Sequence, residues 1–157
     1  MVLSSNNIFQ DYRPIYEQWI AQAQAIAIVY SITDRKSFED IREHRDMLRE
    51  TREKKGQDVD IPIVIVGNKA DKETERAVSK AEGENLAKEF GYPFFEVSAK
   101  ENATVNEPVE ELVRGYRRRQ QKKDRERAAR IEERKKQEEK DERKNTGCLR
   151  GKRCVVM

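Results

Sequence analysis

Long apolar runs are missing from this sequence, which has neither the stretch that a transmembrane helix needs nor the short hydrophobic segment of a secretory signal. Cysteine is scarce: Cys148 and Cys154 are the two present, both within the last ten residues. That placement excludes a disulfide framework and a cysteine-based zinc site. Aromatic residues make up 7% of the chain, and histidine occurs once, as His44. We therefore expect a soluble, cytosolic chain without a metal site, with His44 on its surface.

Charged residues are abundant, at 40% of the chain against 36% apolar residues, so a fully packed globule of 157 residues is not expected. The charges are spread unevenly. Residues 1–113 hold 15 Lys/Arg and 22 Asp/Glu, whereas residues 114–157 hold 18 and 8. The sequence therefore predicts an acidic body of net charge −7 that contains the core, and a basic tail of net charge +10.

Short apolar runs alternate with longer amphipathic stretches in the body. This alternation predicts an α/β fold with about three parallel strands and flanking helices. The clearest helix signal lies at residues 79–90, where Ser79 and Glu82 have capping-box spacing and Gly91 supplies the stop. The strands are expected at residues 25–32, 61–66 and 93–97, and the other helices at residues 36–54 and from Thr104 or Asn106 onward.

The apolar face of the last helix ends near Tyr116, while helix-forming residues continue to about Lys144. Residues 117–147 are therefore predicted to form a charged helix or a disordered spacer. Interleaved glutamates and the lack of aromatic residues after Tyr116 favour a solvated surface over a nucleic-acid site. No nucleic-acid partner is therefore expected. A nucleic-acid-binding charged helix is kept as the third and weakest of the functions considered, after the two given below.

Polar motifs follow two of the predicted strands. Asn68-Lys69-Ala70-Asp71 comes just after the strand at residues 61–66, and Ser98-Ala99-Lys100 follows the strand at residues 93–97. Open α/β sheets bind ligands at the carboxyl edge, where both motifs are expected. An aspartate such as Asp71 can accept two hydrogen bonds, from the N1 and the exocyclic amine of guanine, whereas adenine offers no such donor pair. Asp71 is therefore a candidate for recognition of a guanine base.

At these motifs the sequence resembles the Ras-type small GTPases, whose guanine-specificity motif N-K-x-D and second specificity loop S-A-K are both matched. The resemblance implies a P-loop NTPase-type fold, guanine-nucleotide (GTP/GDP) binding and signal transduction. It also implies that Asp71 reads the guanine edge, that Lys69 lies along the base and ribose, and that Asn68 braces the loop. The backbone amide of Ala99 would face the guanine carbonyl, with Lys100 flanking the base.

The resemblance covers about residues 11–119. Residues 11–20 look like the switch II helix of the family, through which effectors or exchange factors would bind, and Lys36-Ser37-Phe38 looks like the segment that follows. The sequence contains no G-x-x-x-x-G-K-[ST] loop, switch I threonine or D-x-x-G strand end. Ile8 and Phe9 stand where the family has a glycine and the water-positioning glutamine. Residues 1–10 are therefore expected to be unrelated to the family or disordered.

These observations predict an N-terminally truncated family member with a partial Ras-like G domain at residues 11–116. The family uses Mg²⁺, but its ligands are missing here, so we predict no catalytic residue, weak guanine-nucleotide binding if any, and no hydrolysis. The alternative is a non-catalytic, membrane-tethered interaction protein or a truncated product without turnover. The missing phosphate-loop strand would leave the strand at residues 25–32 with an open apolar edge, which predicts marginal stability and self-association.

The chain ends in Cys154-Val155-Val156-Met157, a C-a-a-X box whose final methionine favours farnesyl. One prenyl chain binds membranes only marginally, so a second signal is needed. Cys148 is a candidate for palmitoylation, and a basic cluster is a candidate for contact with anionic lipid. The cluster consists of Arg143, Lys144, Arg150, Lys152 and Arg153. We therefore expect residues 148–157 to be a lipidated anchor, made by a prenyltransferase, at the cytoplasmic face of the plasma membrane.

Overall fold

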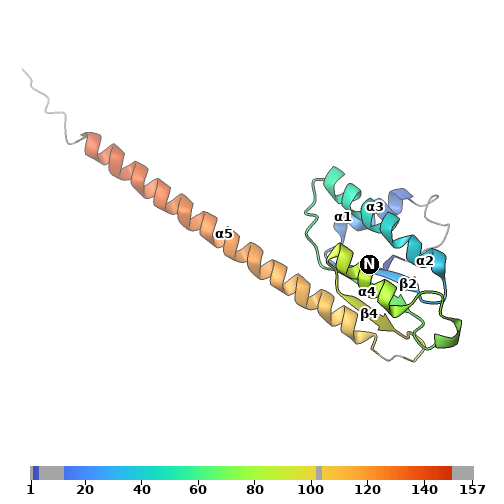
Figure 1. Ribbon diagram of the computed structural model, residues 1–157. Helices are drawn as coiled ribbons and strands as arrows, with labels where there is room; N and C mark the ends of the chain where they lie inside the picture. Colours follow the sequence, from blue (N-terminus) through green and yellow to red (C-terminus); the bar gives the residue numbers. More distant parts are fainter. Residues whose placement is uncertain (1, 4–12, 102–103, 150–157) are drawn as a thin grey trace, which may run out of the picture. The chain divides into compact units, whose positions relative to one another are not determined.

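The computed structural model describes residues 2–3, 13–101 and 104–149 (Figure 1). The chain falls into two units, Met1–Arg117 and Arg118–Met157. The first unit contains the sheet.

The sheet of the first unit has four parallel strands in the order β1-β2-β3-β4. The three predicted strands are confirmed, and their buried apolar residues explain why they form the middle of the fold. The strands are β1 (Val2–Leu3), β2 (Ile26–Ser31), β3 (Ile63–Asn68) and β4 (Phe94–Val97). In register, Ile28 lies beside Ile65, and Val66 lies beside Phe95.

The edge of β2 differs from the prediction. Val2 pairs with Ala27 and Leu3 with Ile28, so β1 covers the first part of an edge that was expected to be fully open. Residues 1–10 were expected to be unrelated to the family or disordered, and within them Val2–Leu3 form this short strand. Two residues are too few to carry a periodicity, so the sequence offered no signal for this strand.

The helices follow the predicted pattern with one break. Residues 36–54 form two helices that meet at Asp40, which keeps helical dihedrals, donates its backbone N–H to the Lys36 carbonyl and accepts from the His44 N–H. Asp34 caps the first helix, its carboxylate accepting from the backbone N–H groups of Lys36 and Ser37. The helices of the two units are α1 (Arg13–Gln22), α2 (Arg35–Glu39), α3 (Ile41–Lys54), α4 (Lys80–Phe90) and α5 (Asn106–Leu149), with a 3-10 turn η2 (Glu73–Glu75).

The ends of α4 confirm the prediction from the sequence. Ser79 Oγ accepts from the Glu82 N–H over 3.3 Å, and the Glu82 carboxylate accepts from the Ser79 N–H over 3.0 Å. At the other end Gly91 has a φ of 73°, the left-handed conformation that ends many helices.

The core lies on both faces of the sheet. Ile28 and Ile65 belong to a buried cluster that also contains residues of α1, α3 and α4, including Ile20, Leu48 and Leu86. A smaller cluster on Val64, Val66 and Val97 is packed by Leu112 from the start of α5. The larger cluster takes most of the buried apolar surface, which drives folding.

His44 is buried, with 6% of its surface exposed, so the prediction of a surface residue is wrong. Ile41, His44 and Leu48 follow one another at helical spacing on the buried face of α3. Burial lowers the pKa of His44, since desolvation disfavours the charged imidazolium.

In the second unit, the described residues 118–149 are helical, as one of the two alternatives predicted. Ion pairs at i to i+4 spacing lie along it, Lys136 with Glu132 at 2.6 Å and Arg134 with Glu138 at 3.2 Å. Ile131 is its exposed large apolar side chain, at 49%. None of the helices within residues 2–3, 13–101 and 104–149 is long and apolar enough to cross a membrane.

Candidate functional site

The two motifs of the sequence meet at the carboxyl edge of β3 and β4. Asn68 is the last residue of β3, and Ser98 directly follows the last residue of β4. The two strands are parallel neighbours, with Asn68 in register with Val97. The backbone N–H of Ala70 donates to the Val97 carbonyl over 3.1 Å, which extends the contact beyond the strands. The prediction that both motifs lie at one edge is therefore confirmed.

Asn68 braces the two loops. Its Oδ1 accepts from the backbone N–H of Lys69 over 2.7 Å and from that of Ala99 over 3.3 Å. Lys69 has a φ of 67°, a left-handed conformation that a lysine seldom adopts. The hydrogen bond from the Lys69 N–H to Asn68 stabilises this turn. The hydrogen bond from the Ala99 N–H connects the first loop to the second.

Asp71 and Ser98 join the loops a second time. Ser98 Oγ donates to Asp71 Oδ1 over 2.7 Å, and it accepts from the backbone N–H of Glu101 over 3.2 Å. Ser98 is buried, at 4% exposure, whereas Asp71 is only half-buried. The hydrogen bond from Ser98 is the main cause that holds the pKa of Asp71 below its ordinary value, with Lys100 and Lys72 adding to it. The Asp71 carboxylate is therefore an ionised acceptor at neutral pH.

The backbone N–H of Ala99 is the group that the resemblance directs at the guanine carbonyl. In the structure it donates to Asn68 Oδ1. The bond is long, at 3.3 Å, so a carbonyl acceptor of a bound base can share or replace it. Lys69 and Lys100 are both exposed, which leaves their side chains accessible to a ligand at this edge.

Below the first loop the sheet is packed by Tyr30. A Cβ on Gly67 would lie 3.0 Å from the Tyr30 hydroxyl oxygen, so glycine is the residue that lets the ring pass under the strand end. Tyr30 is 2% exposed, and its hydroxyl has no hydrogen-bond partner among the described residues. Burial is the main cause that raises the pKa of Tyr30, so the phenol stays neutral.

Tyr30, Arg76 and Glu96 also belong to this region and were not predicted from the sequence. Arg76 and Glu96, each a few residues from one of the motifs, form an ion pair at 2.8 Å. In the sequence both look like surface charges, because each has its partner in a distant segment of the chain. Within the described ranges, no group of three or more His, Cys, Asp and Glu side chains could hold a metal ion.

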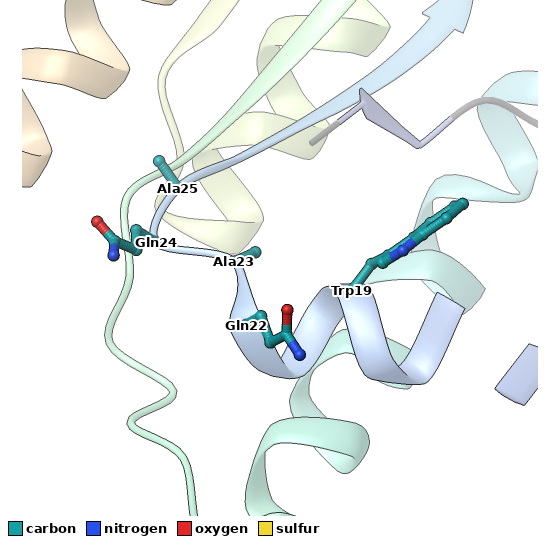
Figure 2. Close-up of a pocket in the computed structure, with 5 residues that line it drawn as sticks. All are labelled: Trp19, Gln22, Ala23, Gln24 and Ala25. Atoms are coloured by element: carbon teal, nitrogen blue, oxygen red, sulfur yellow. The ribbon is translucent and has the colours of Figure 1, made fainter. Parts of the chain in front are cut away.

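A second feature lies on α1, the helix that resembles switch II. Ile15 and Trp19 are 42% and 53% exposed. Trp19 lines an open hollow of about 530 Å³ at the end of α1. Figure 2 shows the side chain of Trp19 on α1, with the other lining residues at the end of this helix and just after it. The hollow is lined by Trp19, Gln22, Ala23, Gln24 and Ala25, none of which titrates near neutral pH.

The predicted anchor cannot be placed. Cys154 and the basic residues Arg150, Lys152 and Arg153 lie outside the described residues, as do Ile8 and Phe9. The backbone of Arg143, Lys144 and Cys148 belongs to the last part of α5.

The parallel sheet flanked by helices, with two motif loops at its carboxyl edge, is the partial P-loop NTPase-type fold expected from the sequence. The model of the Ras family matches residues 9–118, close to the predicted span. The chain therefore belongs to the Ras family, whose members use GTP, GDP and Mg²⁺.

Individual relatives agree with this assignment. The chain is similar to a "Ras-like protein" of Laccaria bicolor, with 40% identity over 109 residues, 69% of this chain and 50% of the relative. It is 38% identical to "Ras-like protein rasZ" of Dictyostelium discoideum over 66% of this chain and 47% of the relative. It is 37% identical to "GTP-binding protein Rit1" of Mus musculus over 70% and 48%. The chain thus spans about half the length of the curated relatives it matches.

Proposed function

We propose that the chain recognises the guanine base of GTP or GDP at the edge of β3 and β4. The observation that carries the proposal is the 2.7 Å bond from Ser98 to Asp71, which holds an ionised acceptor beside the second loop. Asp71 would accept from the guanine N1 and amine, while the Ala99 amide would donate to the guanine carbonyl. Lys69 and Lys100 would flank the base on either side.

The affinity of this site alone is expected to be low. The described residues supply groups for the base, and immobilising a ligand costs roughly 4–15 kcal/mol before any contact is counted. A few hydrogen bonds and stacking leave little surplus, so we expect millimolar or weaker binding by these residues. Hydrolysis also depends on contacts with a metal ion and with the phosphates, which base recognition does not supply. We therefore expect no GTP hydrolysis.

The test is binding of a fluorescent guanine nucleotide, with Mg²⁺, to the purified chain. Asp71→Asn replaces one acceptor oxygen with a donor and should abolish specific binding, and an adenine analogue should not compete. Asp46→Asn, at an exposed position of α3, is the matched control and should bind as the wild type does. Equal binding of adenine and guanine, or an unchanged Asp71→Asn variant, would contradict the proposal.

Hydrolysis is tested separately, by single-turnover measurement of GTP cleavage. We expect no cleavage above the uncatalysed rate. Cleavage by the pure chain that disappears in Asp71→Ala would show that the prediction is wrong.

We further propose that the chain acts in signal transduction at a membrane, held there by a farnesyl group on Cys154. The C-a-a-X sequence supports the modification, and Cys148 and the basic cluster supply the second signal that a single prenyl chain requires. Cys154→Ser should release the chain from membrane fractions, and Cys148→Ser should weaken its retention. Unchanged partitioning of Cys154→Ser would refute the anchor.

The exposed face of α1 supports contact with effectors or exchange factors. Ile15 and Trp19 are large apolar side chains held outward on a helix, the kind of residue that anchors interfaces. If the chain binds no guanine nucleotide, this face and the anchor remain as a membrane-tethered interaction protein, which is the alternative function.

A further inference from the structure

Arg76 lies between two acidic groups, Glu73 of η2 and Glu96 of β4. Its Nη1 and Nη2 donate to the two carboxylate oxygens of Glu96 on β4, over 2.8 and 3.0 Å. Its Nε donates to both oxygens of Glu73, over 2.9 Å, and Nη2 adds a bond of 2.7 Å. Nη1 also donates to the Val78 carbonyl over 3.0 Å. All three nitrogens of the guanidinium are therefore engaged, two carboxylates being bound in the forked geometry that arginine favours.

The contact between Arg76 and Glu96 is shielded from water. Their side chains are 16% and 11% exposed, whereas Glu73 is open to solvent at 70%. The hydrogen bonds to Glu96 and then Glu73 raise the pKa of Arg76 above its ordinary value, so it stays charged at every relevant pH. A shielded, doubly bonded pair fixes the relative position of its two segments far better than an exposed ion pair does.

These contacts connect the segment that follows the first motif to β4, the strand that leads into the second motif. Glu73 lies two residues after Asp71, in η2, and Glu96 lies two residues before Ser98, on β4. Arg76 therefore provides a second connection between these two segments, in addition to the hydrogen bond from Ser98 to Asp71. A shift of the loop away from β4 would have to break both.

We propose that Arg76 is a positioning residue of the site, which holds the loop of Asp71 against β4 so that Asp71 stays within hydrogen-bond reach of Ser98. It acts through Asp71 and Ser98 and makes no contact with the base. Its effect on guanine affinity rests on the proposed function, whereas its effect on the loop can be measured without any ligand.

The first experiment uses the ligand-free full chain with Arg76→Gln, which keeps a polar side chain but removes the fork. NMR should show the pKa of the Asp71 carboxyl moving up toward its ordinary value, because the bond from Ser98 loosens. The backbone amides of Ala70 and Ala99 should exchange with solvent at least about tenfold faster, since local opening becomes easier. Arg76→Lys, which keeps the charge beside Glu96 but cannot bridge both carboxylates, should give a smaller change in each.

Arg52→Gln is the control for general loss of stability. Arg52 is buried, at 3% exposure, and donates to the carbonyls of Ile20, Ala23 and Asp58, away from the motif loops. It should lower the melting temperature while leaving the titration of Asp71 unchanged. The proposal is overturned if Arg76→Gln leaves Asp71 and the two amides as in the wild type, or if Arg52→Gln moves them equally.

Guanine affinity is then compared in the same variants. If the wild-type chain binds a fluorescent guanine nucleotide, Arg76→Gln should weaken it by about tenfold, and Arg52→Gln should leave it unchanged below the melting temperature. If the wild type binds none, the proposed function fails, and the ligand-free measurements still decide whether Arg76 positions the loop.

Discussion

Gly83 lies where α4 touches the sheet, and a methyl group has no room there. A Cβ at this position would lie 2.6 Å from Phe94 Cζ and 2.7 Å from the Tyr30 hydroxyl oxygen. Gly83→Ala should therefore lower the free energy of unfolding by about 1–3 kcal/mol, despite the better helix propensity of alanine. Urea denaturation measures the change, with Glu84→Ala on the exposed side of α4 as the control. A more stable Gly83→Ala variant would contradict the packing described.

Glu82 makes stability depend on pH in the acid range. Its pKa falls from an ordinary 4.5 to about 2, first because Arg35 donates to it and then because Ser79 does. The group favours the folded state fully above the ordinary pKa and loses this effect as the pH falls toward the lower value. The difference in melting temperature between the wild type and Glu82→Gln should therefore be constant from about pH 7 to pH 5 and shrink below it. A difference that stays constant down to about pH 2 would show that the pKa is not lowered.

His44, like Glu82, makes the folded state less stable as the pH falls, but at a higher pH. Its pKa is lowered in the folded chain, so the unfolded chain binds the extra proton first, and stability decreases as the pH falls below the ordinary value of 6.5. The sequence could not predict this, because a lone histidine between charged residues has the pattern of a surface residue. It is buried because Ile41 and Leu48 turn this face of α3 toward the core, and His44 lies on the same face.

Among the elements, α1 depends on α3 for its position. Arg52 Nη1 donates to the carbonyls of Ile20 and Ala23 over 2.7 and 3.0 Å, which satisfies the end of α1 with a buried cation. Removing it leaves buried acceptors unsatisfied, so Arg52→Gln should lower the free energy of unfolding by about 1.5–3 kcal/mol. Proteolysis should then cut near residues 22–25 first. Uniform cutting along the chain would instead indicate that α1 is not held by this contact.

The local elements were predictable where a short-range signal sets them. Ser79, Glu82 and Gly91 define both ends of α4, since capping depends on neighbours in sequence. The break between α2 and α3 was missed because the apolar spacing continues through Asp40. The strand β1 was missed because two residues carry no period. The site was predictable as a pair of motifs, whereas the Arg76 contacts required the fold.

At the scale of the whole molecule, one edge and one face remain lightly covered. Among the described residues, β1 pairs with two of the six residues of β2. Val109 and Val113 on α5 are 55% and 43% exposed. Exposed apolar groups and unpaired strand edges favour association between chains, so the prediction of marginal stability and self-association stands.

Sedimentation velocity over a range of concentrations tests this prediction. We expect the mean sedimentation coefficient to rise with concentration and thermal unfolding to be broad. Val109→Glu with Val113→Glu should reduce association, and Ile131→Glu, an exposed apolar position in the second unit, serves as the control. A monomer with a sharp thermal transition at all concentrations would refute it.

The length of α5 has a consequence for how this part of the chain can change. Residues 118–149 of the helix span about 48 Å, at about 1.5 Å and 100° per residue. A deletion of seven residues shortens the helix by about 10 Å and nearly preserves the direction of every later side chain, whereas a deletion of two residues turns them by about 200°. Insertions and deletions here therefore differ from those in a loop. Each one changes the length of the helix, and one that does not match a whole number of turns also changes the direction of the later side chains.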